Sequence, residues 1–136
     1  MFRYSTCLKL RDTDAAGVAF FASYYAIAHD AYEAFLSEQG YSLVSWLDQV
    51  HLPIVHSEAD YKAPLRLGDA FTIEVTCLRI GERSFTINYD FCVEDKVSAS
   101  LKTVHVAVQK DQSLKTKAIG LPAKLKSLLT LIEVEA

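Results

Sequence analysis

The chain has 136 residues, of which 51% are hydrophobic and 23% are charged, and its formal net charge is −3. A chain of this length buries roughly 68% of its unfolded surface, so it needs no disulfide or metal to fold, and its apolar content excludes a disordered protein. The slightly acidic balance gives no general electrostatic reason to bind nucleic acid or an anionic membrane, and we expect neither as a partner. We expect one domain, residues 1–136.

Hydrophobic periodicity divides the first part of the chain into a strand, a loop and two helices. Alternating apolar residues predict the strand, and an Asp-Thr-Asp sequence followed by Gly17 predicts the loop. In the long helix Ser23 is the expected N-cap, and Gly40 lies where a glycine ends a helix. In chain order we expect a strand from Met1 to Leu10, a loop from Arg11 to Ala22, a helix from Ser23 to Gln39 and a short helix from Ser42 to Val50.

The long helix carries apolar residues at helical spacing, which predicts one buried face. Its several alanines make it thin, so we expect a close packing partner. The residues of the expected buried face are Tyr25, Ala28, Tyr32, Phe35 and Leu36.

The remainder of the chain is predicted to be mostly strand. Apolar and polar residues alternate in runs that are joined by short turns, and such turns favour antiparallel hairpins. One strand, one long helix and a series of antiparallel strands together indicate an α+β fold. The expected elements are strands at Ile54 to Lys62, Ala70 to Ile80, Ser84 to Val93, Ser98 to Gln109 and Lys115 to Ile119, and a helix from Pro122 to Leu129.

The three cysteines, Cys7, Cys77 and Cys92, are widely spaced among apolar residues, and we expect three reduced core cysteines. No CxxC or HxxxH spacing supports a zinc site, and we expect neither a metal nor a cofactor. Reduced cysteines and the lack of a recognisable signal peptide predict a cytoplasmic protein. The longest uncharged run, Ala15 to Ala28, has 14 residues, fewer than the ~20 that span a bilayer.

The stretch RDTDAAGVAFFASYY, from Arg11 to Tyr25, places two aspartates directly before this uncharged run. With the layout above, it resembles the hot-dog-fold thioesterases of the 4-hydroxybenzoyl-CoA thioesterase type, over essentially the whole chain. That resemblance implies a hot-dog fold, in which an antiparallel sheet wraps around one long helix. Its strongest part is the motif D-x-D-x-x-G-[hydrophobic]-x-[aromatic]-[aromatic]-x-x-Y at Asp12 to Tyr24; weaker similarities are LPIVHSEADYKAP at Leu52 to Pro64, GERSFT at Gly81 to Thr86 and KAIGLP at Lys117 to Pro122.

The resemblance also assigns roles within the motif. The family's catalytic aspartate corresponds to Asp14, which would attack the thioester carbonyl or activate water for that attack. The thioester oxygen would accept a backbone N–H at the start of the helix, here that of Phe21. Gly17 would let the backbone turn tightly beside the substrate, and Tyr24 would help to position the substrate.

The chemistry of a helix N-terminus agrees with these roles. Its free N–H groups and positive dipole end can stabilise an oxyanion and keep a neighbouring carboxylate ionised. The competing structural interpretation is that Asp14 only caps a turn or the helix. For Asp12 the structural interpretation is favoured, as a turn-forming partner of Thr13.

CoA carries phosphates, so basic residues are expected at the mouth of the site, and Lys62, Arg66 and Arg83 are the candidates. In the family the hairpin before the SF strand carries several basic residues; here only Arg83 matches, and Glu82 departs from the pattern.

The segments HDAYEAFL and LPIVHSEADY resemble one subgroup, the 1,4-dihydroxy-2-naphthoyl-CoA thioesterases of phylloquinone and menaquinone synthesis. The leading hypothesis is therefore an acyl-CoA thioesterase, with an aromatic acyl-CoA as substrate. The alternatives are an acyl-carrier-protein thioesterase, a non-catalytic acyl-CoA-binding module, and a hydratase of the same fold. A hydratase needs a histidine paired with an acid near the helix start, and the nearest, His29, lies about two turns into the helix.

We expect a homodimer or homotetramer. The resemblance implies sheets that join edge to edge. In addition, a single thin helix is too little to cover a sheet that is apolar on both faces, and Val104, Val106 and Val108 would otherwise form an exposed patch.

Overall fold

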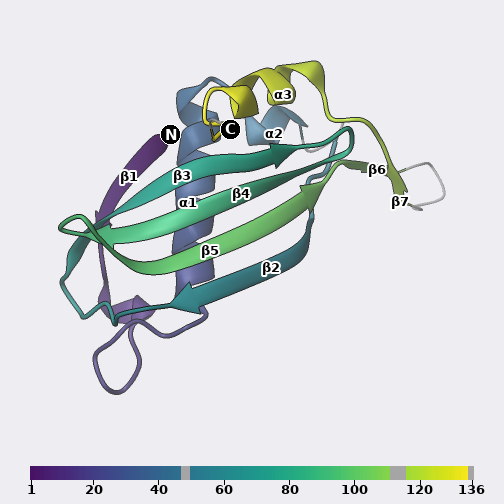
Figure 1. Ribbon diagram of the computed structural model, residues 1–136. Coiled ribbons are helices and arrows are strands. Elements are labelled where there is room, and N and C mark those ends of the chain that lie inside the picture. Colours follow the sequence, from purple (N-terminus) through teal and green to yellow (C-terminus); the bar gives the residue numbers. More distant parts are fainter. Residues whose placement is uncertain (47–49, 111–115, 135–136) are drawn as a thin grey trace.

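The structure is a computed structural model that describes residues 1–46, 50–110 and 116–134 (Figure 1). A 3₁₀ turn at Leu10–Asp12 precedes the long helix. The other elements are β1 (Phe2–Cys7), α1 (Ser23–Glu38), α2 (Leu43–Trp46), β2 (Ile54–Tyr61), β3 (Ala70–Ile80), β4 (Ser84–Val93), β5 (Lys96–Val106), β6 (Val108–Lys110), β7 (Thr116–Ala118) and α3 (Ala123–Thr130).

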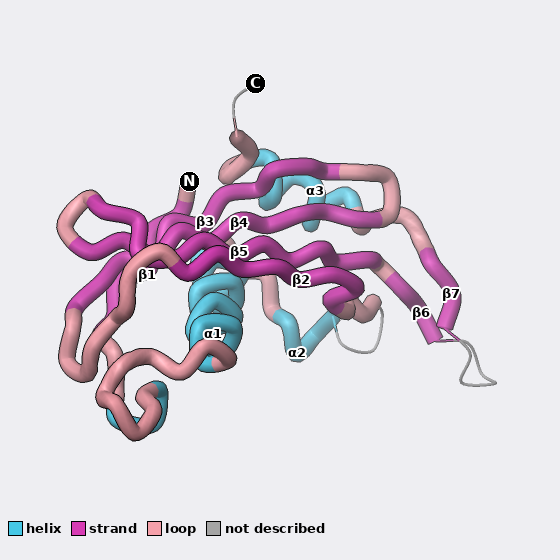
Figure 2. Tube along the Cα trace, turned by 60° about the horizontal axis from the view of Figure 1, so that its bottom comes forward, coloured by secondary structure: helices cyan, strands magenta, loops and turns pink. Residues whose placement is uncertain are grey.

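The described strands form one five-stranded sheet in the order β1-β3-β4-β5-β2 and a separate two-stranded ribbon of β6 and β7. Neighbouring strands are antiparallel throughout. The expected α+β class and hairpins are confirmed, and β3 and β4 have the bounds that the sequence predicts. Figure 2 shows α1 lying against one face of the sheet.

The core lies between α1 and this face of the sheet. Along β4 the side chains of Phe85, Ile87, Tyr89 and Phe91 are buried and alternate with half-buried polar ones. Burial of one large apolar side chain stabilises the fold by about 1.5–3 kcal/mol, so the pattern fixes which face of each strand meets the helix.

The opposite face of the sheet is largely polar. Asn88 and Asp90 of β4 and Ser100 and Lys102 of β5 line it, and the Ser100 hydroxyl donates a hydrogen bond to Asp90 Oδ1 at 2.7 Å. The assumption that the sheet is apolar on both faces is therefore wrong.

Helix α1 begins and ends close to its predicted bounds, with two corrections. The N-cap is Ala22 rather than Ser23, and none of the described side chains caps the helix. Tyr24 is buried whereas Tyr25 is only half-buried. Gly40 follows the helix with φ +75°, the left-handed conformation expected for a terminal glycine.

Two strand predictions also need correction. The first strand ends at Cys7, and Leu10 is 75% exposed in the 3₁₀ turn. The predicted strand to Gln109 is divided into β5 and β6, because Ala107 turns its N–H to the carbonyl oxygen of Arg83. Lys115 and residues 47–49, which belong to predicted elements, lie outside the described residues.

The three cysteines are free, but only Cys77 is buried; Cys7 is exposed and Cys92 is half-buried. The prediction that all three belong to the core is therefore wrong for two of them. Among the described residues, no helix is long and apolar enough to cross a membrane.

Candidate active site

Asp14 lies in an exposed loop directly before α1. Its Oδ1 atom accepts the backbone N–H of Ala16 at 2.8 Å and that of Val18 at 3.4 Å, and the Gly17 N–H donates to the Asp14 carbonyl oxygen at 3.1 Å. Gly17 has φ +75°, a conformation that favours glycine, so it lets the loop fold back on the carboxylate. Within the described part of the chain Oδ2 has no partner, so one oxygen is held and the other is open to solvent.

Asp12 has a different environment. Its Oδ2 atom accepts the backbone N–H of Lys9 at 3.1 Å, and its carbonyl oxygen accepts the N–H of Phe20 at 2.9 Å. Thr13 completes the same turn by donating its hydroxyl to the carbonyl oxygen of Leu10 at 2.8 Å. Asp12 therefore builds the loop that carries Asp14, as the structural interpretation of this residue expects.

Some backbone N–H groups at the start of α1 are already paired and others are not. Ser23 N–H donates to Phe20 O at 2.9 Å and Tyr25 N–H donates to Ala22 O at 3.2 Å. For the N–H groups of Phe21, Ala22 and Tyr24 there is no acceptor among the described residues. Unpaired N–H groups and the positive end of the helix dipole make this turn suitable for binding a developing oxyanion.

A cavity of about 280 Å³ opens beside this turn. Tyr24 forms part of its wall: the residue is 3% exposed, and its ring meets the rings of Tyr61 and Phe91 edge to face, with centroids 5.1 and 5.2 Å away. Asp14 is not part of the cavity wall. The lining residues are Ala19, Phe21, Tyr24, Tyr61, Lys62, Ala63 and Pro64.

The two walls of the cavity come from segments far apart in the sequence. Ala19 N–H donates to Leu65 O at 2.8 Å, and Leu67 N–H donates to Gly17 O at 3.0 Å. An isolated bridge pairs Val18 with Arg66. These contacts attach the loop of Asp14 to the chain that follows β2.

Two of the three predicted cations lie near this site. Lys62 lines the cavity, and Arg66 pairs with the loop of Asp14. Arg83 lies at the other end of the sheet: its neighbour Ser84 pairs with Val106, whereas Tyr61 pairs with Ala99. Seven residues of β5 separate these positions, or roughly 23 Å at ~3.3 Å per residue. Within one chain, Arg83 does not reach the cavity.

Sequence reasoning assigned no role to Tyr61, which forms one wall of the cavity and donates its hydroxyl to the Phe21 carbonyl oxygen at 3.1 Å. The signal available was weak: a tyrosine at the end of a strand, before Lys-Ala-Pro.

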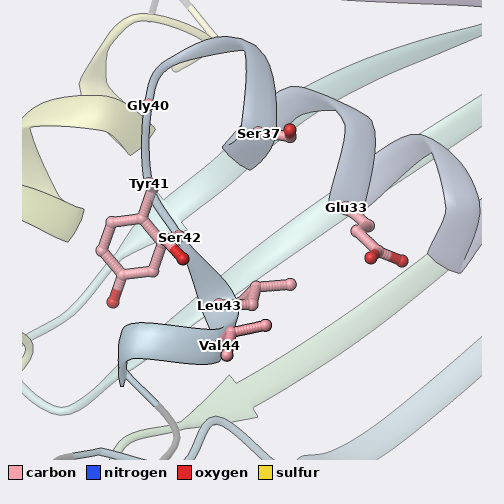
Figure 3. Close-up of a pocket in the computed structure, with 7 residues that line it drawn as sticks. All are labelled: Glu33, Ser37, Gly40, Tyr41, Ser42, Leu43 and Val44. Carbon is pink, nitrogen blue, oxygen red and sulfur yellow. The ribbon is translucent and has the colours of Figure 1, made fainter.

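A second hollow, of about 300 Å³, lies at the opposite end of α1 (Figure 3). Glu33 and Ser37 of α1 line it together with residues 40–44, which lead from α1 into α2. The described residues include no group of three His, Cys, Asp or Glu side chains that could hold a metal ion.

An exposed carboxylate in the loop that leads into a helix N-terminus, on a sheet-and-helix scaffold, is a site suited to acyl-transfer chemistry. Comparison with known proteins identifies the scaffold. The family model of the thioesterase-like superfamily matches residues 8–129. The chain therefore belongs to the thioesterase-like superfamily, as the motif predicted.

Individual relatives agree with this assignment. The chain is 41% identical over 110 residues to the 1,4-dihydroxy-2-naphthoyl-CoA hydrolase of Rippkaea orientalis, covering 77% of this chain and 80% of the relative. A solved 1,4-dihydroxy-2-naphthoyl-CoA thioesterase from Synechocystis superposes with a TM-score of 0.86 at 28% identity and 95% coverage of each chain. A gentisyl-coenzyme A thioesterase structure gives a TM-score of 0.81 at 26% identity, with 95% and 99% coverage.

Proposed function

We propose that this protein is an acyl-CoA thioesterase that hydrolyses the thioester of an aromatic acyl-CoA to the free acid and CoA. The observation that carries the proposal is the Asp14 carboxylate, exposed and held through one oxygen, in the loop that leads into the free N–H groups of α1. The family, the relatives and the cavity beside this turn support it.

Hydrolysis at this site needs one base or nucleophile and one oxyanion donor. In the water route, Asp14 accepts a proton from water while the water oxygen bonds to the carbonyl carbon; the C–S bond then breaks and CoA leaves as the thiol after taking up a proton. In the direct route, an Asp14 oxygen bonds to that carbon, the C–S bond breaks and CoA leaves as the thiolate, which takes up a proton from solvent; water then hydrolyses the resulting anhydride and restores the Asp14 carboxylate. In both routes Phe21 N–H stabilises the oxyanion, and one such donor contributes about 3–4 kcal/mol.

We infer that the acyl group is planar and aromatic, with 1,4-dihydroxy-2-naphthoyl-CoA as the leading candidate because relatives are named for it. Tyr24, Tyr61 and Phe21 give the cavity aromatic walls. A ring that stacks on such side chains gains about 0.5–1.5 kcal/mol beyond the burial of its area. Tyr24 positions the substrate as part of the cavity wall, and Gly17 does so by shaping the loop that carries Asp14.

Lys62 and Arg66 are proposed to bind the CoA phosphates, since Lys62 lines the cavity and Arg66 pairs with the loop that carries Asp14. Arg83 can contribute only if a second copy of the chain brings it there. Such a copy has an available surface: β2 is an edge strand whose Ile54 and Val55 are 43% and 60% exposed. Exposed edges favour pairing, so we propose a homodimer or homotetramer in which the hot-dog sheets join edge to edge. Light scattering that gives a monomer of about 15 kDa would contradict this.

The location in the cytoplasm, the single domain over residues 1–136 and the lack of a cofactor remain predictions. The experiment that tests the function is a panel of aromatic acyl-CoA, straight-chain acyl-CoA and acyl-carrier-protein thioesters, with thiol release as the readout. We expect kcat/KM to be highest for the aromatic CoA thioesters. Faster turnover of palmitoyl-CoA or acetyl-CoA would contradict an aromatic acyl group. A preference for acyl-carrier-protein thioesters would show that the carrier protein, and not CoA, is the thiol carrier of the substrate. Tight binding without turnover would indicate a non-catalytic binding module.

A further inference from the structure

Tyr61 connects the end of β2 to the turn that precedes α1. Its hydroxyl donates to the carbonyl oxygen of Phe21 at 3.1 Å, across 40 residues of sequence, and its ring meets the Tyr24 ring edge to face. In the described part of the chain no other side chain is hydrogen-bonded to the backbone of residues 20–22. Among the described side chains, one phenol thus links the turn that holds the proposed oxyanion donors to the end of β2, in addition to the backbone bonds of the preceding loop.

The carbonyl of Phe21 and the N–H of Ala22 belong to the same peptide group, so a bond to one affects the other. Donation to the carbonyl polarises the peptide and strengthens its N–H as a donor, by roughly 10–30% per bond in cooperative chains. The bond also restricts rotation of the turn and so fixes the direction of the Phe21 and Ala22 N–H groups. The ordinary pKa of tyrosine is about 10, so the phenol carries the proton that it donates at neutral pH, and partial burial raises the pKa of Tyr61 further.

We propose, building on the thioesterase function proposed above, that the Tyr61 hydroxyl is a positioning group that holds the peptide between Phe21 and Ala22 so that both N–H groups face the developing oxyanion. Tyr61 does not touch the reacting atoms in this account; it acts through the turn. Its effect therefore appears in the transition state, where the oxyanion forms, and not in the bound substrate.

The test compares Tyr61→Phe with a matched control, Tyr4→Phe. Both changes remove one phenol oxygen; Tyr4 lies half-buried on β1, and its hydroxyl has no hydrogen-bond partner among the described residues. For Tyr61→Phe we expect kcat on an aromatic acyl-CoA to fall about tenfold, the worth of one neutral hydrogen bond. KM, and the Kd of the corresponding non-hydrolysable thioether of CoA, should stay within about twofold, and Tm should stay close to that of Tyr4→Phe.

A third variant, Tyr61→Leu, separates the ring from the hydroxyl. If Tyr61→Phe keeps the wild-type kcat and only Tyr61→Leu loses it, the ring packs and the hydroxyl does not position, which overturns the proposal. A loss of thioether affinity and Tm in parallel with kcat would also overturn it, because Tyr61 would then be a structural residue. If the wild-type protein cleaves no thioester at all, the proposed function itself fails; an active wild type with an unaffected Tyr61→Phe rejects only the positioning role.

Discussion

The two halves of α1 have contrasting surroundings. Beyond the middle of the helix, Tyr32 packs into a stack of rings in which His105 lies between Tyr32 and Phe85, with centroids 5.0 and 4.8 Å away. Before the N-terminus, Asp14 and Phe21 are exposed, and Asp14 is followed by the small residues Ala15, Ala16 and Gly17. One half therefore contributes buried area and stability, and the other keeps polar groups available for chemistry. Substitutions in the two regions should accordingly affect different measurements.

The largest effect is expected in the core. Phe35 is 2% exposed and its ring packs 5.5 Å from that of Phe2. Phe35→Ala removes this buried ring, so the free energy of unfolding should fall by about 3–5 kcal/mol, while kcat per folded molecule stays the same. Denaturant unfolding and an active-site titration measure the two quantities. Leu131→Ala, at a residue that is 61% exposed, is the control and should change stability by less than about 0.5 kcal/mol.

The next largest effect is the response of the same core to acid. His105 Nδ1 donates to the Leu52 carbonyl oxygen at 3.1 Å, and Nε2 accepts the Thr103 hydroxyl at 3.0 Å, so the ring is held neutral. Burial, with a smaller contribution from His29, lowers the pKa of His105 to about 4 from an ordinary value of 6.5. Because the unfolded chain binds the proton more tightly, this stability is present above pH 6.5 and is lost as the pH falls towards 4.

We expect a loss of about 3 kcal/mol from His105 over this range of pH, to be measured as the free energy of unfolding against pH. His105→Gln cannot bind the proton, so its stability should depend less on pH between 6.5 and 4. An equal dependence in the two proteins would show that other groups cause the acid sensitivity.

The smallest expected effect on stability compares two glycines. Gly17 and Gly40 both have φ +75°, and a Cβ at either position meets no atom within 4 Å. An alanine at either site should therefore cost about 1 kcal/mol, from backbone strain alone. Only Gly17→Ala should also lower kcat, because Gly17 shapes the loop that holds the Asp14 carboxylate. A similar loss of activity in Gly40→Ala would remove the distinction between the two ends of the helix.

The sequence allowed the hairpin of β3 and β4 to be predicted, because each buried side chain alternates with a polar one. It did not allow the break at Ala107 to be predicted: the alternation of Val104, Val106 and Val108 continues, but β4 begins at Ser84, opposite Val106, and offers no further partner. The sequence analysis placed Tyr25 on the buried face of α1, where the structure has Tyr24. The rotation of a helix about its axis is set by its packing against the sheet, which residue spacing alone does not report.

In the candidate site, too, the residues of one local motif could be predicted, whereas contacts between distant segments could not. Asp14 and Gly17 belong to one local motif, so a resemblance could point to them. Arg83 was proposed from a local match as well, but strand pairing places it at the far end of the sheet. The bond from Tyr61 to Phe21 joins residues 40 positions apart. No pattern of spacing reports such a contact, because it depends on where β2 ends relative to α1.

In the proposed mechanism Asp14 performs the chemistry, whereas Asp12 builds the loop. The most direct test is kcat for Asp14→Asn and Asp12→Asn on an aromatic acyl-CoA, with Tm measured for each variant. Asparagine keeps the size and the hydrogen bonds of the carboxylate but has no charge, so it can neither attack the carbonyl nor accept a proton. We predict that Asp14→Asn loses at least about 100-fold in kcat, or roughly 2.7 kcal/mol, with little change in Tm, and that Asp12→Asn loses far less. Near wild-type turnover in Asp14→Asn, or equal losses in both variants with Tm lowered in both, would contradict the account.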